Sequence, residues 1–257
     1  LNVLAGKLTE DSMRRLNGAV VVNNRTFSDV ASSFLLEADL IDVGRDESAA
    51  FWQRLMKNTM IHLQLTSVAL ILGCLFGLII GVLVYRSPGV SRAVVYLAGL
   101  MQTIPSIALL ALMIPLFGIG FVPAIIALFL YSILPILRNT ITALLTIDPL
   151  LKRVADAIGL TEGQQLRYVL LPLALPNILA GIKTAAVISI GTATLAAFIG
   201  AGGLGEPIVT GLALNDTNLI LQGAIPAALL AILVELLFEL LERLLVKPHM
   251  IKGVLPS

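Results

Sequence analysis

Polar side chains interrupt the long apolar runs of this 257-residue chain at a few positions, and they are the first candidates for a functional site. A hydroxyl or an amide within hydrocarbon is costly unless it faces protein or a water-filled passage. Such residues would suit the transfer of a polar solute, although ordinary hydrogen bonds between helices explain each of them singly at least as well. The candidates for a translocation path are Gln102, Thr103, Ser106, Tyr131, Asn139, Thr192 and Thr194.

Residue patterns for catalysis are missing from the chain. The only histidines, His62 and His249, lie near opposite ends of the expected fold, and neither H-E-x-x-H nor G-x-S-x-G occurs. The single cysteine, Cys74, lies in an apolar run and indicates no metal site. The phosphate-binding pattern G-x-x-x-x-G-K-S/T is also absent. We therefore expect no enzyme activity, no metal and no cofactor bound by this chain.

The composition is that of a membrane protein. With 58% hydrophobic residues, 13% charged residues and a mean hydropathy of +0.97, the chain is not an ordinary soluble domain. Five apolar runs each have the ~20 residues that a helix needs to cross ~30 Å of hydrocarbon. They cover residues 59–85, 93–117, 120–141, 177–201 and 218–241. The predicted fold class is all-α: a polytopic membrane protein with five transmembrane helices and a short soluble N-terminal segment.

Two further features are predicted at the N-terminal side. Residues 1–48 contain no run long enough to span a bilayer, and short helices are expected over Thr9–Leu16 and Ser28–Leu36. Residues 49–58 place Phe51, Trp52, Leu55 and Met56 on one side, which predicts an interfacial amphipathic helix at the lipid headgroup level. In the first apolar run, Gly73, Gly77 and Gly81 form a smooth face where another helix can approach closely.

A polar, helix-forming island separates the third and fourth apolar runs. Asp148 is a good N-cap and Pro149 suits the first helical position, so a short amphipathic helix is expected to run until Gly159. A capping box over Thr161–Gln164 predicts the start of a second short helix. Breaks after this second helix are expected at Pro172 and Pro176. Two short helices should therefore meet at a glycine elbow.

The elbow resembles the EAA loop of binding-protein-dependent ABC importer permeases. Gly159, nine residues, Val169, one residue and Leu171-Pro172 match the G-x9-I-x-L-P tail of that loop, with Val in place of Ile. The front half departs, because Arg153-Val154-Ala155 stands where the family has Glu-Ala-Ala. The resemblance implies a cytoplasmic coupling loop over residues 148–176 that docks on an ATPase, formed by Arg153, Ala155, Asp156, Ala157, Gly159, Leu160, Val169, Leu171 and Pro172. Asp156 is the nearest carboxylate that could replace the missing glutamate, and an interface helix without a coupling role is the alternative.

A wider resemblance covers residues 59–245 and includes QTIPSIALLALM, TATLAAFIGAGGLGEPIV and GAIPAALLAIL. These segments resemble the glycine betaine/carnitine/choline branch of ABC importer permeases. The resemblance implies a type I ABC importer permease fold in a bacterial inner membrane, with a second permease copy in a homodimer or pseudo-dimer. It also implies a cytoplasmic ATPase dimer, which uses ATP and Mg, and an extracytoplasmic substrate-binding domain on this chain or another. Residues 1–48 resemble the C-terminal end of such a domain, although an unrelated extension is the alternative.

The distribution of Lys and Arg predicts the orientation. The loops at residues 118–120 and 202–217 contain neither residue, whereas the other ends of the runs are basic. The basic residues on those ends are Arg86, Arg92, Arg138, Lys152, Arg153, Arg167, Arg243, Lys247 and Lys252. By the positive-inside rule the elbow and the tail at 247–257 face the cytoplasm, and residues 1–48 lie outside.

Two other kinds of transporter remain as alternatives. One is an ABC importer permease for another small solute, such as the amino acid methionine. The other is an ion-coupled secondary transporter subunit, which usually carries charged relays near the midplane. No ionisable residue is expected near the middle of the first four spans, which argues against the second alternative. Membrane lipid is an expected partner and nucleic acid is not.

Overall fold

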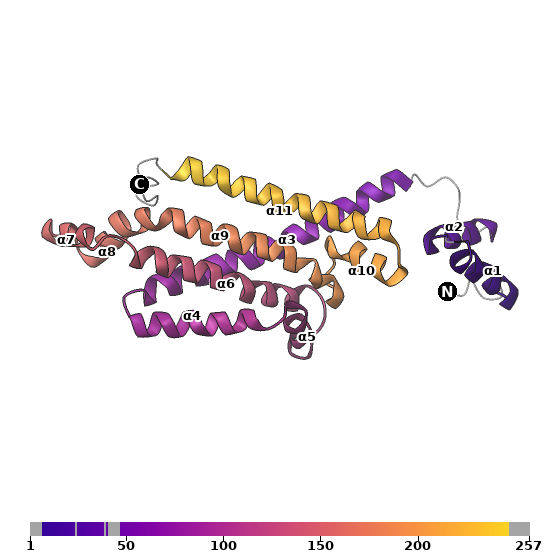
Figure 1. The fold of residues 1–257 in the computed structure, drawn as a ribbon, viewed down its shortest axis with the longest axis horizontal. Helices are drawn as coiled ribbons and strands as arrows, with labels where there is room; N and C mark the ends of the chain where they lie inside the picture. Colours follow the sequence, from indigo (N-terminus) through magenta and orange to yellow (C-terminus); the bar gives the residue numbers. More distant parts are fainter. Residues whose placement is uncertain (1–6, 24, 39, 41–46, 247–257) are drawn as a thin grey trace.

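The computed structural model describes residues 7–23, 25–38, 40 and 47–246, and every regular element in these ranges is a helix (Figure 1). The α-helices are α1 Glu10–Val21, α2 Phe27–Glu37, α3 Glu47–Val84, α4 Pro88–Thr103, α5 Ser106–Phe117, α6 Phe121–Leu145, α7 Pro149–Ala157, α8 Glu162–Gln165, α9 Leu171–Ala193, α10 Gly205–Leu214 and α11 Thr217–Leu245. A π-helical turn covers Leu166–Leu170 and a 3-10 turn covers Leu195–Ile199. The predicted tail at 247–257 lies outside the described residues.

Within the described residues, four helices are long and apolar enough to cross a membrane, and a bent pair of helices adds a fifth crossing if the pair forms one span. The four span candidates are Ala49–Val84, Phe121–Leu145, Glu162–Ala193 and Thr217–Leu245. The predicted second span is not one helix, because α4 and α5 meet at an angle of 94°. Pro105 explains this break, since proline disfavours the helical conformation at Ile104, which is extended with ψ 126°.

The N-terminal helix of the membrane part differs from its prediction. Residues 49–58 do not form a separate interfacial helix, because α3 runs without a break from Glu47 to Val84. No glycine or proline lies between Glu47 and Leu72, so nothing in the sequence stops the helix there. Trp52 and Met56 are nevertheless exposed on this first part of α3, as an interfacial segment requires.

The second elbow helix also differs from its prediction. Pro172 and Pro176 do not break the chain, because α8, the π-helical turn and α9 form one helical run over Glu162–Ala193. Pro172 lies in the first turn of α9, and Leu171 N–H bonds to the Leu166 carbonyl across the wider π turn. Membrane helices tolerate proline where such local adjustments satisfy the backbone. The fourth span therefore begins at the elbow itself and ends at Ala193, earlier than residue 201.

The glycine face of α3 packs against α6 as predicted, along Gly73, Gly77 and Gly81. A Cβ added at Gly77 would lie 2.9 Å from Ile136 Cγ2, and one added at Gly81 would lie 2.8 Å from Thr140 Cγ2. Both distances are shorter than carbon atoms tolerate, so no larger residue fits without movement of α6. The close approach of these two spans depends on the absence of side chains.

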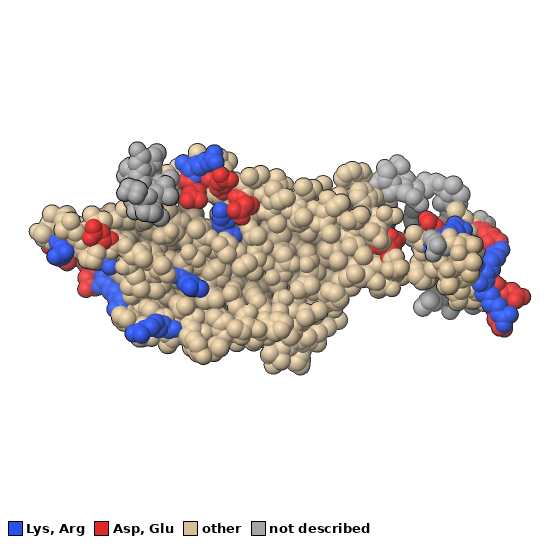
Figure 2. Space-filling view, in the orientation of Figure 1, with Lys and Arg blue, Asp and Glu red and all other residues tan. Residues whose placement is uncertain are grey.

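The spans run antiparallel along the length of the molecule (Figure 1). The elbow formed by α7 and α8 lies at the same end as the C-terminal end of α11, whereas α5 and α10 lie at the opposite end. Charged side chains of the bundle gather mainly toward the elbow end, and most of its visible surface is uncharged (Figure 2). This distribution agrees with the basic loops that the sequence places on one side.

The N-terminal helices confirm the two expected short helices and extend the first of them. Thr9 caps α1 through a capping box with Ser12, and α1 continues to Val21. The two helices are joined by an ion pair of 2.8 Å between Arg15 and Glu37. They form a small unit that is separate from the apolar helices in Figure 1.

Replacing Gly77 with leucine should destabilise the bundle, because the new side chain would collide with Ile136 on α6. We expect a loss of about 2 kcal/mol and a lower midpoint of thermal unfolding in detergent. The matched control is Gly99→Leu on α4, where an added Cβ meets nothing within 4 Å. Equal midpoints for the two variants would contradict the proposed role of the glycine face.

Candidate functional site

Helix α7 presents an uncovered apolar face at one end of the molecule. Its start follows the prediction, since the Asp148 carboxylate accepts a hydrogen bond of 2.8 Å from Leu150 N–H and Pro149 is the first helical residue. Ala155 is the only buried residue of this helix. The apolar side chains of Leu150, Leu151, Val154 and Ile158 are exposed, with Ile158 at 69%. Arg153, Asp156 and Ala157 lie on the same short helix and are exposed too. The face is free for a partner.

The turn after α7 has the geometry of a Schellman motif. Gly159 has φ +79°, in the left-handed region. Its N–H donates to Asp156 O at 2.9 Å, and Leu160 N–H donates to Ala155 O at 3.0 Å. A Cβ added at Gly159 meets nothing within 4 Å, so the backbone conformation, not lack of space, requires glycine here. The predicted glycine elbow is confirmed in its conformation.

Gln165 holds the elbow closed, and the sequence interpretation missed it. Its side chain is almost buried, at 8% exposure. Gln165 Nε2 donates to Asp156 Oδ1 at 2.5 Å and to Leu160 O at 3.1 Å. The amide therefore ties the end of α7 to the start of the next helix. Asp156, which was expected to offer its carboxylate to a partner, uses one oxygen inside the elbow. A glutamine after a capping box is too common a pattern to have indicated this role.

The second half of the elbow is fixed to the spans. Thr161 and Gln164 form the predicted capping box, with bonds of 2.8 and 3.4 Å. Glu162 pairs with Arg86 in the connection between α3 and α4. Arg86 Nε also donates to the Tyr85 hydroxyl at 2.8 Å, and this bond, together with the Glu162 carboxylate, raises the pKa of the Arg86 guanidinium.

An apolar cluster lies directly below these polar contacts. Tyr85, Leu144, Leu170 and Ala174 are buried in it, and they come from three different parts of the chain. The expected coupling residues Val169 and Leu171 pack against this cluster, and Pro172 is half-buried. The residues after Gly159 thus connect the elbow to the spans, whereas the residues before it form the exposed surface.

The bend between α4 and α5 gathers several of the candidate path residues. Gln102 Nε2 donates to the Tyr131 carbonyl at 2.7 Å, and the Tyr131 hydroxyl donates to the Ile104 carbonyl. Thr103 is exposed beside the break and bonds to Leu100 O, and Ser106 is half-buried at the first residue of α5. The structure thus brings four of the seven candidates together, and three of them donate hydrogen bonds to backbone carbonyls.

The other three candidates do not join this group through hydrogen bonds. Asn139 Nδ2 donates to Pro135 O at 2.8 Å, and the Thr192 and Thr194 hydroxyls donate to carbonyls one turn earlier in the chain. Asn139 also lies at the contact of α6 with α9, where a Cβ added at Gly181 would be 2.7 Å from Asn139 Cβ. For these three residues the structure agrees with ordinary hydrogen bonding within the helical chain.

An ion pair joins two of the spans. Lys183 Nζ of α9 lies 2.8 Å from the Glu235 carboxylate of α11. One turn further along α11, Glu239 pairs with Arg243 at 2.7 Å, as the i, i+4 spacing predicts. Lys183 is an ionisable residue within the fourth candidate span, and the expectation for the middle of the first four spans stays a prediction. Because the charge of Lys183 is matched by a carboxylate on the neighbouring span, it forms a structural pair and not an isolated relay.

His62 is a second buried residue that the sequence interpretation left without a role. It is fully buried on α3. Its Nδ1 accepts a hydrogen bond from Leu204 N–H at 3.3 Å, so Nε2 carries the proton and donates to the Ile190 carbonyl at 3.1 Å. The neutral ring thereby joins α3, α9 and the glycine-rich turn before α10. Within the described residues no group of three or more His, Cys, Asp or Glu could hold a metal ion.

Comparison with known proteins places this geometry in a family. The model of the family described as "Binding-protein-dependent transport system inner membrane component" matches residues 73–247. The chain is 44% identical to the choline transport system permease protein OpuBB of Bacillus subtilis, over 74% of this chain and 87% of that protein. It is 46% identical to the osmoprotectant import permease protein OsmW of Salmonella typhimurium, over 69% of this chain and 85% of that protein.

A solved structure agrees with the sequence relatives. A chain of the MetNI methionine ABC transporter, in an inward-facing conformation, matches 76% of this chain and 98% of its own length, with a TM-score of 0.69 and 27% identity. The predicted permease fold is confirmed, and the chain is a transport subunit and not an enzyme. The chain belongs to the family of binding-protein-dependent transport system inner membrane components.

Proposed function

We propose that this chain is the permease subunit through which an ATP-driven importer carries a compatible solute such as glycine betaine, choline or carnitine. The observation that carries the transport role is the exposed apolar face of α7, joined by a glycine turn to a helix that continues into a span. The solute class rests on the relatives at 44% and 46% identity, whose names specify choline and osmoprotectants.

The coupling movement starts at the exposed face of α7. A cytoplasmic ATPase dimer binds ATP and Mg and moves this face when it closes. Gln165 passes the movement to the helical run Glu162–Ala193, which has no break before the far end of α9. The Arg86–Glu162 pair passes it to α3 and α4 as well. The spans therefore receive the movement through two connections. The bend near Gln102 and Tyr131 is the part of the candidate solute path that would change conformation.

The proposed assembly contains three kinds of partner. A second permease copy, as a homodimer, would complete the membrane domain, and two ATPase subunits would dock on the two elbows. An extracytoplasmic substrate-binding domain would deliver the solute, and residues 1–48 would be the end of that domain. The elbow and the tail at 247–257 would face the cytoplasm of a bacterial cell, with residues 1–48 outside.

A permease for an amino acid is the second candidate. The match to a methionine transporter chain favours it, because that structure aligns over 76% of this chain. The identity to that chain is 27%, against 44% to 46% for the osmoprotectant relatives. Since solute preference follows the closer sequence relationship, the quaternary ammonium class is the better proposal.

Coupling should fail when Gly159 is replaced by valine, because a side chain disfavours the left-handed backbone of the turn by ~1–2 kcal/mol. We expect the amount of solute imported per ATP hydrolysed to fall about tenfold in a reconstituted complex, because ~1–2 kcal/mol corresponds to about a tenfold change in an equilibrium. Gly163→Val is the matched control, since Gly163 lies four residues away in an ordinary helical conformation with open space around it. Wild-type coupling in an intact Gly159→Val complex would rule out the proposed role of the turn.

The proposed orientation can be tested with single cysteines on a Cys74→Ser background. Asn218→Cys, at the start of α11, should react with an impermeant reagent in intact cells. Arg92→Cys, near the start of α4, should react only after the membrane is opened, because α4 begins at the elbow end. The reverse pattern of labelling would overturn the topology.

Weak binding of the solute to the permease is also expected. A quaternary ammonium group is recognised by a cage of aromatic faces. Here the Tyr131 hydroxyl is bonded to the backbone, and Phe129 packs edge-on against Phe76 with centroids 5.6 Å apart. Calorimetry of glycine betaine, choline and carnitine with the full chain should show dissociation constants no lower than about millimolar. Micromolar binding that persists without residues 1–48 would contradict the proposal.

A further inference from the structure

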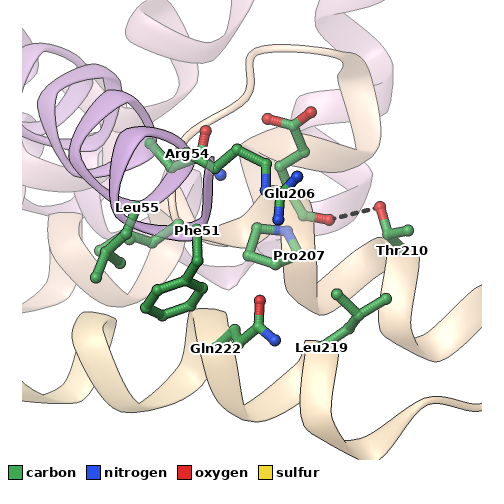
Figure 3. Close-up of a pocket in the computed structure, with 10 residues that line it drawn as sticks. Phe51, Arg54, Leu55, Glu206, Pro207, Thr210, Leu219 and Gln222 are labelled. Carbon is green, nitrogen blue, oxygen red and sulfur yellow. Dashed lines mark hydrogen bonds between the residues drawn. The ribbon is translucent and has the colours of Figure 1, made fainter. Parts of the chain in front are cut away.

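A cavity lined by both polar and apolar side chains lies at the end of the molecule opposite the elbow, with a volume of about 350 Å³. Its walls come from the first part of α3, from α10 and from the start of α11 (Figure 3). This volume is within the range of sites that bind small molecules or headgroups. The cavity is remote from the coupling elbow, and neither the candidate path nor the coupling mechanism uses it.

Opposite charges line this cavity. Arg54 extends from α3 over Pro207 toward α10, and Glu206 lies beside it (Figure 3). Neither Arg54 nor Glu206 forms an ion pair with a residue in the described part of the chain. The amide of Gln222 and the ring of Phe51 complete the side toward α11. The cavity therefore offers a cation and an anion to the same ligand, which suits a zwitterion.

An apolar groove adjoins this cavity. It has a volume of about 560 Å³ and shares Phe51 and Gln222 with the cavity. Its other lining includes Leu221, Ile225 and Pro226, which follow one another along α11 into the span. The exposed side chain of Trp52 next to Phe51 is typical of the headgroup level of a bilayer. A chamber with charged side chains at headgroup level that continues as an apolar groove has the two-part shape of a phospholipid.

We propose that the cavity binds the phosphoethanolamine headgroup of a phospholipid and that the groove holds one of its acyl chains. Arg54 would receive the phosphate, since guanidinium groups match phosphate oxygens in geometry and charge. Glu206 would accept hydrogen bonds from the ammonium group. A phosphocholine headgroup cannot donate such bonds, and the Glu206 carboxylate disfavours an anionic lipid that lacks an amine. A free solute would leave the groove unexplained, so the lipid is the better occupant.

The site lies between α3, α10 and α11, and the turn before α10 is also bonded to α3 through Leu204 N–H and His62 Nδ1. A Cβ added at Gly223 of α11 would lie 2.4 Å from Leu204 O, and one added at Gly205 of α10 would lie 1.9 Å from Thr194 O. The bound lipid would add a link from α10 and α11 to the free-standing first part of α3. It would brace the end of the permease that lies farthest from the elbow.

Native mass spectrometry of the full-length permease in its complex tests this proposal. The complex is incubated with equal amounts of phosphatidylethanolamine, phosphatidylcholine and phosphatidylglycerol that carry the same acyl chains. We expect preferential retention of phosphatidylethanolamine, and Arg54→Gln should reduce this retention about fivefold, as for a partly exposed charged hydrogen bond. Arg92→Gln, an exposed arginine at the elbow end, is the matched control and should leave retention unchanged.

Two further variants separate the headgroup from the acyl chain. Glu206→Gln should raise the retention of phosphatidylglycerol relative to phosphatidylethanolamine, because it removes the negative charge. Ile225→Asn in the groove should weaken all three lipids, whereas Leu229→Asn, one turn further along α11 and equally exposed, should not.

Three results would overturn the proposal. These are equal retention of the three lipids, the same loss in Arg54→Gln as in Arg92→Gln, and displacement of the bound lipid by free glycine betaine, which would make the cavity a solute site. Bound lipid is measured without transport, so this test and the transport experiments fail or succeed separately.

Discussion

The need to satisfy every backbone polar group within hydrocarbon controls the irregular parts of this bundle. An unpaired backbone group there costs several kcal/mol. At the bend before Pro105, the Tyr131 hydroxyl donates to the exposed carbonyl of Ile104, and Gln102 donates to the carbonyl of Tyr131. At the start of α9, the wider π turn lets Leu171 N–H reach the Leu166 carbonyl just before Pro172. At both of these irregular places the chain provides new hydrogen-bond partners, and both places lie at functional candidates.

The π turn before Pro172 keeps the elbow in one continuous helical run with the fourth span. If the helix had ended at Pro172, a flexible linker would connect the elbow to the span, and movement of α7 would not reach the span. Instead, the run from Glu162 to Ala193 is a single helix, and the tie from Gln165 to Asp156 fixes α7 to its first turn. In the proposed coupling mechanism, the exposed apolar face of α7 is the outer end of a rigid helical connection that reaches across the membrane part. Without this continuous helix, a partner that binds α7 would not move the spans.

Local signals in the sequence were sufficient for the elbow, because capping depends on a few neighbouring residues. Asp148, the Thr161–Gln164 box and Gly159 all act as their spacing predicts. The errors concern features that depend on distant residues. A lysine in an apolar run gives no sign that Glu235 lies beside it, and nothing near His62 points to Leu204, 142 residues later. The effect of a proline is equally nonlocal. Pro105 produces a bend of 94°, where the Tyr131 hydroxyl donates to the Ile104 carbonyl, whereas Pro172 is accommodated by the π turn of its own helical run.

The contacts of α9 decide what can move during transport. In its middle it is pressed against α6, since an added Cβ at Gly181 would lie 2.7 Å from Asn139 Cβ. Two residues further along the helix, the Lys183–Glu235 ion pair of 2.8 Å holds α11. Toward its far end the Ile190 carbonyl is held by His62 of α3. A helix that is fixed to three neighbours, in its middle and toward its far end, moves together with them. The change of access in the proposed importer therefore falls between this chain and the second permease copy, with the bend between α4 and α5 as the part of the chain that is free to adjust.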